Sequence, residues 1–227
     1  MRKLLPLAAW LALAALAPAQ AGSPAAEKSA LSQVRFDQNL DAPVPLTLPF
    51  RDESGRTVPL GRYFGQRPVI LTLVYFECPM LCTESLNGLV RTLRSISLNP
   101  GKDFNLVTVS FDPSEKPALA AAKKSSYVER YGRPTAKEGW AFLTGDAEPI
   151  KRLADAVGFH YAYDPELKQF AHATGVVVLT PQGKIAQYFY GVEYPPRDMR
   201  LAGGATVLLM AMSIGFFLWW EKTRAAA

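Results

Sequence analysis

One stretch in the middle of the chain is almost entirely apolar, β-branched and aromatic. Residues 69–76 read VILTLVYF. A run of this length and composition predicts a β-strand that is covered on both faces, because a strand with one exposed face would alternate with polar residues. Such a strand needs helices packed beside it, which limits the fold to the layered α/β classes.

The sequence on either side supplies the alternating strands and helices that this strand requires. The further strands are expected at residues 46–50, 57–60, 104–111, 140–143, 175–179 and 184–190. The helices are expected at residues 84–97, 119–131 and 148–157, and the first and the last of them place apolar residues on one side. The last two strands are joined by the tight-turn sequence TPQG and therefore form an antiparallel hairpin. The prediction is an α/β domain whose mixed central sheet carries helices on both faces.

The first 21 residues have the layout of a secretory signal peptide. Arg2 and Lys3 precede an uncharged Leu/Ala run at 4–17, and small residues two apart favour cleavage after Ala21. The apolar run is shorter than the roughly 20 residues that a membrane-spanning helix needs. Cleavage leaves a polar, Ala/Ser-rich tether at 22–44 in front of a domain at 45–200.

A second apolar segment lies near the end of the chain. Residues 201–220 contain no charge, and 20 helical residues rise about 30 Å, the thickness of the hydrocarbon layer. Trp219 and Trp220 suit the interface of a membrane, and the charged residues that follow suit a short tail. We therefore expect a transmembrane anchor at 201–220 and a cytoplasmic tail at 221–227. The protein would be a single-pass protein of the cell membrane, with its domain on the exported, periplasmic or extracytoplasmic side.

Charge limits the partners of the exported domain. Its basic and acidic residues are nearly equal in number, because much of the net charge of +5 comes from the two ends of the chain. No concentrated basic stripe is present, so nucleic acid is excluded as the expected partner.

The chain contains two cysteines, and they lie between the apolar strand and the first helix. A helix that starts beside Cys78 and Cys82 is expected to lower the thiol pKa and favour thiolate. Side chains four residues apart on a helix have Cβ atoms about 5–6 Å apart, against about 3.8 Å in a relaxed disulfide. A disulfide would thus be strained and would close too short a loop to stabilise the fold much. A metal ion between the sulfurs relieves the mismatch.

A metal held by two thiolates needs a further ligand, and the chain has two histidines. His160 lies in a segment that resembles a strand edge. His172 lies in the loop that enters the penultimate strand, which can return beside the end of the first apolar strand. The residues alone leave both histidines open and favour His172.

Several features together resemble the Sco/SenC family of thioredoxin-fold copper proteins, over about residues 45–191. They are the apolar strand, the Cys78-x-x-x-Cys82 motif with Pro79 inside it, the strand end at 109–113 and the isolated His172. Two departures stand out. Met80 replaces the Asp that many members carry, and the chain runs almost directly into residue 201, so that a terminal helix of the domain is expected to be missing.

The resemblance implies a thioredoxin-like fold and a copper site formed by Cys78, Cys82 and His172. Asp112 would lie near this site without being a ligand. Two thiolates and an imidazole suit Cu(I) and can also hold Cu(II). Zinc is the main competitor, because a Cys₂His set with an open position is also a zinc arrangement.

The first functional hypothesis is a membrane-anchored copper metallochaperone for the dinuclear copper centre of cytochrome c oxidase. Its partners would be the copper-receiving oxidase subunit and a periplasmic copper donor or thiol reductant, and this role involves no catalytic turnover. The rival is an enzyme, a thiol-disulfide oxidoreductase in which Cys78 attacks and Cys82 resolves, so that the oxidase copper-site cysteines are kept reduced. A docking module without chemistry of its own is a third class.

Overall fold

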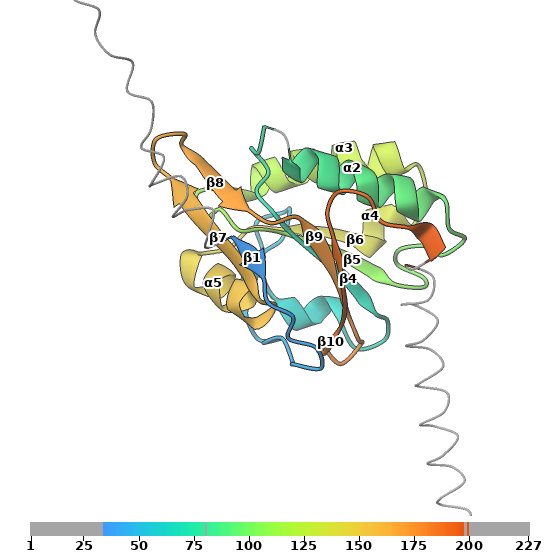
Figure 1. Ribbon diagram of the computed structural model, residues 1–227. Coiled ribbons are helices and arrows are strands. Elements are labelled where there is room, and N and C mark those ends of the chain that lie inside the picture. Colours follow the sequence, from blue (N-terminus) through green and yellow to red (C-terminus); the bar gives the residue numbers. More distant parts are fainter. Residues whose placement is uncertain (1–33, 80, 198, 200–227) are drawn as a thin grey trace, which may run out of the picture.

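The computed structural model describes residues 34–79, 81–197 and 199. Several expected features lie outside these residues, namely the signal peptide at 1–21, the tether as far as residue 33, Met80 of the cysteine motif, the anchor at 201–220 and the tail at 221–227. The described part forms one layered α/β body (Figure 1). Within it, no helix combines the length and the apolar character that a bilayer crossing requires.

The main sheet has five strands in the order β10-β9-β4-β5-β6. They are β4 (Val69–Val74), β5 (Asn105–Ser110), β6 (Trp140–Leu143), β9 (Gly175–Leu179) and β10 (Ile185–Tyr190). Strands β4, β5 and β6 run parallel, whereas β9 is antiparallel to both β4 and β10. The predicted mixed sheet is therefore confirmed. Every residue of β4 is buried, because this strand lies at the centre of the sheet between covered faces.

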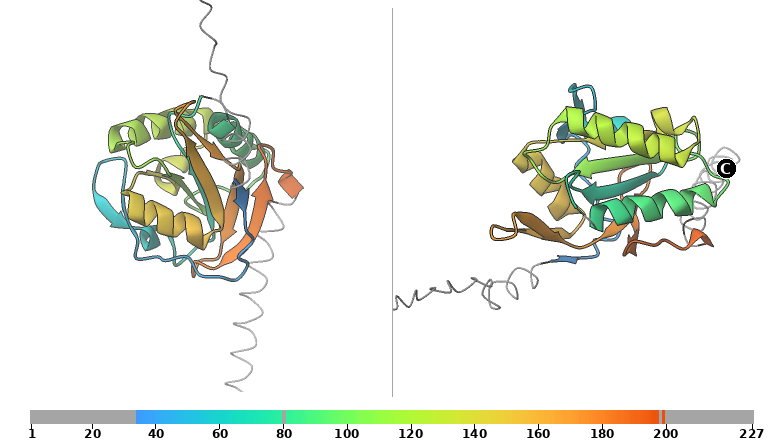
Figure 2. Two further views of the ribbon diagram at one scale, coloured as in Figure 1. Left: turned by 60° about the vertical axis from the view of Figure 1, so that its left-hand side comes forward. Right: turned by 90° about the horizontal axis from the view of Figure 1, so that it is seen from above.

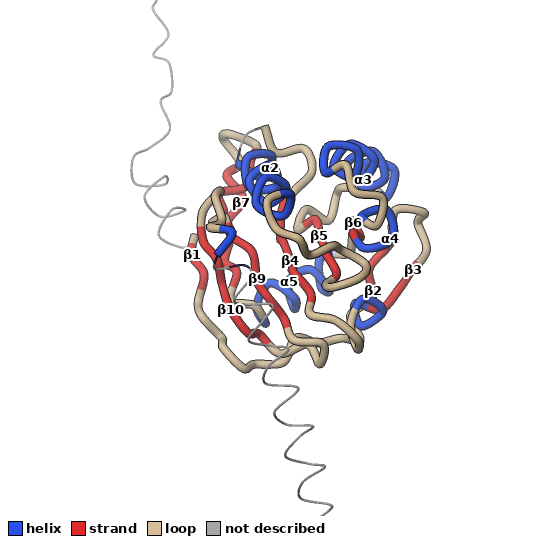
Figure 3. Tube along the Cα trace, turned by 90° about the vertical axis from the view of Figure 1, so that its right-hand side faces the viewer, coloured by secondary structure: helices blue, strands red, loops and turns tan. Residues whose placement is uncertain are grey.

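Helices cover both faces of this sheet, as Figure 3 shows. The helices α2 and α3 lie on one side and α5 on the other. The elements are η1 (Leu60–Tyr63), α2 (Leu81–Arg94), α3 (Pro117–Tyr131), α4 (Ala136–Gly139) and α5 (Ala147–Ala156). The helix expected at 84–97 begins and ends three residues earlier. Its end is stabilised by Arg133, whose guanidinium donates to the carbonyl oxygens of Arg94 at 3.0 Å and Ile96 at 2.7 Å.

The core between α3 and the sheet is aromatic. Trp140 and Phe142 of β6 are fully buried, with ring centroids 5.2 Å apart, and Tyr127 of α3 packs against both. The indole N–H of Trp140 donates to the hydroxyl of Thr108 at 2.9 Å, which satisfies the one polar group of that side chain.

A second sheet of three short strands was not predicted. It has the order β1-β7-β8, from β1 (Arg35–Phe36), β7 (Phe159–Asp164) and β8 (Gln169–His172). Strands β7 and β8 form a hairpin that projects from the same end of the molecule as the start of α2 (Figures 1 and 2). The expectation that His172 lies in a loop is wrong, because it is the last residue of β8 and pairs with Tyr161.

The start of β7 requires a glycine. Gly158 has a φ of +65°, and a Cβ atom there would lie 2.0 Å from the carbonyl oxygen of Asp37. The close approach lets the Asp37 N–H donate to the Gly158 carbonyl at 2.8 Å. This contact holds the segment with β1, which lies within the predicted tether, against β7.

Asp52 organises the turn between β2 (Pro49–Arg51) and β3 (Thr57–Pro59), which form the predicted hairpin. Its carboxylate accepts hydrogen bonds from the backbone N–H groups of Ser54 and Arg56, both at 3.0 Å, and from the Ser54 hydroxyl at 2.6 Å. Burial by itself would raise the pKa of Asp52. The hydrogen bonds from Ser54 and Arg56 outweigh burial and lower this pKa from 3.8 to about 2.

We expect this lowered pKa to make the fold sensitive to acid. Because the folded-state pKa lies below the unfolded value, the Asp52 carboxylate stabilises the fold above about pH 4, and this contribution is lost as the pH falls toward about 2. The loss is about 2 kcal/mol. Urea unfolding at about pH 6 and about pH 2 measures it. The Asp52→Asn variant should lose correspondingly less stability between these pH values, and an equal loss in both proteins contradicts the assignment.

Candidate metal centre

The two cysteines lie where β4 leads into α2. Residues 75–79 form a short connection after the strand, and Cys82 is the second residue of the helix. The Cys82 N–H donates to the Cys78 Sγ at 3.5 Å, so the sulfur of Cys78 accepts one of the N–H groups that the first helical turn leaves without a backbone partner. Both cysteines are buried, at 8% exposure for Cys78 and 2% for Cys82, and they are not joined by a disulfide.

Glu115 holds the connection that carries Cys78 through hydrogen bonds to its backbone. Its carboxylate accepts hydrogen bonds from the backbone N–H groups of Phe76 at 2.9 Å and Glu77 at 2.8 Å, and from the hydroxyl of Ser110. The residue is 6% exposed. Burial raises the pKa of Glu115, while the three hydrogen bonds act in the opposite direction. The side chain therefore joins the end of β5 to the connection that follows β4, one residue before Cys78.

His172 reaches the cysteines from the β7–β8 hairpin. Its Nε2 lies 3.2 Å from the Sγ of Cys82, and its Nδ1 lies 2.9 Å from the carbonyl oxygen of Ala173. Because a carbonyl can only accept, Nδ1 carries a proton, and Nε2 is the ring nitrogen that faces the Cys82 sulfur. A histidine that binds a metal through Nε2 carries its proton on Nδ1.

Aromatic side chains fix the orientation of the His172 ring. The ring centroids of Phe111 and Tyr75 lie 5.3 Å and 5.7 Å from the imidazole, in edge-on arrangements, and that of Phe159 lies 6.3 Å away. Burial raises the pKa of the Tyr75 hydroxyl above its usual range, and the neighbouring Cys78 thiol raises it further. The imidazole is thus held in an apolar wall, which limits solvent access to the sulfurs.

The ligand atoms of Cys78, Cys82 and His172 all lie within 4.8 Å of one another. Donors at about 2.0–2.3 Å from one ion are about 3.5–4 Å apart in a trigonal arrangement, so only small side-chain movements separate the present geometry from a closed site. Two sulfurs and one imidazole nitrogen form a soft donor set. The residues present therefore fit a thiophilic metal ion.

The expected lowering of the thiol pKa is wrong for Cys82. The neighbouring Cys78 sulfur raises the pKa of Cys82, and burial raises it further. The hydrogen bond between the two thiols and their burial both favour the protonated form of Cys82, and the hydrogen bond from the Tyr75 backbone does not offset them. A bound cation reverses the balance, since a coordinating thiol is deprotonated.

Comparison with known proteins agrees with this geometry. A sequence model of the SCO1/SenC family matches residues 45–201. The chain belongs to the SCO1/SenC family. Protein SCO2 homolog, mitochondrial, of Bos taurus is 25% identical over 143 residues, which are 61% of this chain and 50% of the bovine protein. The chain therefore spans about half the length of this curated relative.

Solved structures show that the SCO1/SenC chain has the thioredoxin-like α/β fold of its relatives. A crystal structure from Aquifex aeolicus is 27% identical, with a TM-score of 0.64, and the match covers 72% of this chain and 92% of that one. Arabidopsis thaliana ScoI, solved with copper bound, is 20% identical with a TM-score of 0.55, and the match covers 76% of this chain and 99% of the plant protein.

The structure shows which candidate residues of this SCO1/SenC chain lie together and which do not. It brings Cys78, Cys82 and His172 together. His160 lies outside this cluster, on β7, where its Nε2 is 2.8 Å from a carboxylate oxygen of Asp37. Asp112 is not part of the cluster either, and its carboxylate accepts a hydrogen bond from the backbone N–H of Ser114 at 2.8 Å.

Sequence reasoning missed Glu115. A carboxylate a few residues after a buried strand is common in solvated turns, and no local pattern marks it as a buried acceptor. Its role as an acceptor for this connection can be recognised only once the ends of β4 and β5 are known to be neighbours.

Proposed function

We propose that the chain is a membrane-anchored copper chaperone, which binds copper through Cys78, Cys82 and His172 and delivers it to the dinuclear copper centre of cytochrome c oxidase. The observation that carries the proposal is the convergence of these three ligand atoms within 4.8 Å. Membership of the SCO1/SenC family and the copper-bound Arabidopsis relative support copper as the metal.

The donor set suits a metal that must be released again. Cu(I) is stable with two or three soft ligands, and thiolates bind it strongly while an imidazole also accommodates Cu(II). His172 comes from a different element than the cysteines. It can therefore leave the metal first, which opens a position for a ligand of the receiving protein while both sulfurs still hold the ion.

Membrane anchoring belongs to the same proposal. The apolar segment at 201–220 would place the domain on the exported side of the membrane, where the copper-receiving oxidase subunit and a copper donor or thiol reductant are accessible. A single-pass anchor keeps donor and recipient at one membrane surface.

Copper titration of the full-length chain tests the three-ligand site. We expect His172→Ala to lower the affinity for Cu(II) at least about a hundredfold and to shift the sulfur-to-copper absorption band, because the nitrogen donor is removed. His160→Ala is the matched control and should leave both unchanged. An unaltered Cu(II) affinity and spectrum in the His172 variant would rule out the three-ligand site.

The second candidate function is thiol-disulfide exchange, which the adjacent, reduced Cys78 and Cys82 favour. The thiolate of Cys78, the more exposed of the two residues, attacks a disulfide of the oxidase copper site. Cys82 then attacks the Cys78 sulfur of the mixed disulfide and releases the second sulfur of the target as a thiol, so that a Cys78–Cys82 disulfide forms and the target gains two thiols. If the His172→Ala variant loses copper binding and still reduces disulfides, the result favours this second function.

A further inference from the structure

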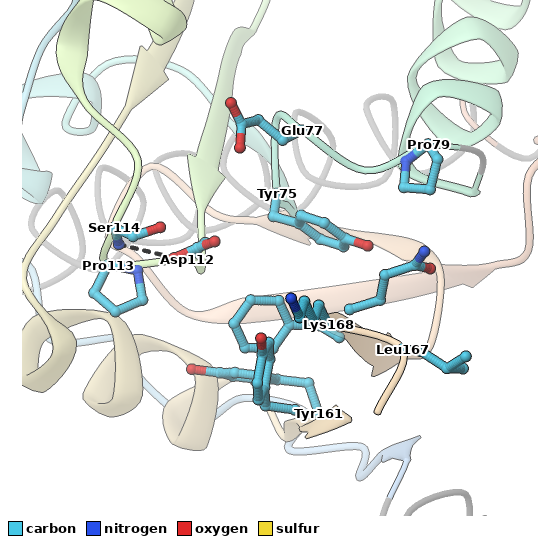
Figure 4. A pocket seen from close by; sticks show the side chains of 12 residues that line it. Tyr75, Glu77, Pro79, Asp112, Pro113, Ser114, Tyr161, Leu167 and Lys168 are labelled. Atoms are coloured by element: carbon cyan, nitrogen blue, oxygen red, sulfur yellow. Dashed lines mark hydrogen bonds between the residues drawn. The ribbon is translucent and has the colours of Figure 1, made fainter. Parts of the chain in front are cut away.

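A groove opens beside the candidate metal centre (Figure 4). Its volume is about 760 Å³. The walls come from three segments far apart in the sequence, namely the connection after β4, the loop at 112–114 and the β7–β8 hairpin. None of its lining residues belongs to the proposed ligand set.

One part of the groove is unusually apolar for a surface. In the described part of the chain, the exposed large hydrophobic side chains are Leu40, Tyr163, Leu167 and Tyr190. Tyr163, at 54% exposure, and Leu167, at 68%, both line the groove. Exposed apolar side chains that cluster at one hollow indicate an interaction surface, whereas single ones do not.

The other part of the groove is acidic. Glu77 and Asp112 line it, and neither forms an ion pair within the described residues, while the one basic residue of the lining, Lys168, follows Leu167 in the β7–β8 hairpin. In the view of Figure 4 these carboxylates lie on one side of the Tyr75 ring and Leu167 lies on the other. A matching partner therefore carries a basic side chain at one position and a hydrophobic side chain at another.

The groove is also lined by residues that adjoin the cysteines and by residues of the strand that carries His172. Pro79, which lines it, follows Cys78 directly, and Gln169 and Phe170 belong to the strand that ends at His172. Among the described strands, β8 is at the edge of its sheet and pairs with no further strand on its outer side, although the Phe170 N–H already donates to the Tyr75 hydroxyl. An edge strand offers backbone hydrogen bonds to an extended peptide.

We propose that this groove is the docking site for an extended segment of the copper-receiving protein. The segment places a hydrophobic side chain against Tyr163 and Leu167 and a basic side chain beside Glu77 and Asp112. It thereby brings the receiving ligands to the mouth of the copper site, and its contact with β8 can move His172 away from the metal. This inference rests on the proposed copper-delivery function.

A paired set of surface variants tests the docking site. The probe is the apo form of the soluble copper domain of a cytochrome c oxidase subunit, mixed with the copper-loaded full-length chain. The double variant Tyr163→Ser/Leu167→Ser should bind this domain at least about tenfold more weakly and transfer copper more slowly at limiting concentration. The control Leu40→Ser/Tyr190→Ser removes the same residue types, similarly exposed, from outside the groove and should match wild type.

A charge variant tests the acidic part separately. Raising the salt concentration should weaken the binding of the wild-type chain, and Glu77→Gln should show a smaller salt dependence.

The outcomes distinguish the docking site from the copper site. Both double variants should retain wild-type copper affinity, because they remove no ligand. Equal binding of the oxidase domain by the groove and control variants, or no binding by the wild type, overturns the docking proposal. So does a groove variant that only converts dimers of this chain into monomers, because the occupant is then a second copy. Failure of the wild type to bind copper overturns the proposed function instead.

Discussion

Replacement of Cys82 by serine is expected to lower the affinity for Cu(I) at least about a thousandfold, equivalent to about 4 kcal/mol. The hydroxyl is a hard donor that does not ionise at neutral pH, and Cys82 adjoins both other ligands. Its N–H lies 3.5 Å from the Cys78 sulfur, and its own sulfur lies 3.2 Å from the His172 nitrogen. Cys78→Ser is expected to have an effect of the same size. Competition with a chromophoric Cu(I) chelator, under reducing conditions, measures both.

Two controls show whether an effect of the cysteine variants is due to the lost ligand or to a change of the fold. Serine is close to cysteine in shape, so circular dichroism of the cysteine variants should remain that of the wild type. Thr83→Ser, one residue further along α2, removes a methyl group and no proposed ligand, and it should retain the wild-type affinity. A cysteine variant that binds Cu(I) as tightly as the wild type would show that the two sulfurs do not bind the ion together.

Replacement of Glu115 by alanine is expected to lower the free energy of unfolding by roughly 3 to 5 kcal/mol. The change leaves the N–H groups of Phe76 and Glu77 without their acceptor and opens a cavity beneath the connection that carries Cys78. Copper affinity should fall as well, because that connection is no longer held at one distance from His172. Urea unfolding and the chelator competition measure the two effects.

Two further variants separate the hydrogen bonds that Glu115 accepts from its charge and from the general effect of removing a carboxylate. Glu115→Gln retains one carbonyl acceptor and should lose clearly less stability than the alanine variant. Glu129→Ala, at an exposed position of α3, should change stability by less than about 0.5 kcal/mol. Equal stability of the wild type and Glu115→Ala would mean that water replaces the carboxylate and that the connection is held by other contacts.

The main sheet and its helices were predictable because their signals are local. The strand predicted at 69–76 is observed as the fully buried β4 at 69–74, and the strand expected at 140–143 has the observed bounds of β6. A covered strand and an apolar helical stripe each carry their pattern within a few residues. The β7–β8 hairpin was missed although aromatic residues alternate at positions 159, 161 and 163, because short apolar runs of mixed composition do not distinguish a strand from a loop.

The candidate site was predictable in its members and not in its arrangement. The rarity of cysteine and histidine in this chain reduced the choice to two thiols and two imidazole rings. The resemblance to the family then favoured His172 over His160. The raised pKa of Cys82 was not predictable, because it depends on the distance between two sulfurs and on their burial, which only packing sets.

The order of residues by itself determined that a buried strand leads into an amphipathic helix through a connection that carries both thiols. Composition also restricted the possible nitrogen ligands to two. The tertiary structure alone decided that His172, ninety residues after Cys82, directs its Nε2 at that sulfur, that a distant carboxylate supports the connection, and that a groove lies alongside. The physical reason is that periodicity and helix starts act over a few residues, whereas coordination and docking depend on distances that the assembled sheets impose.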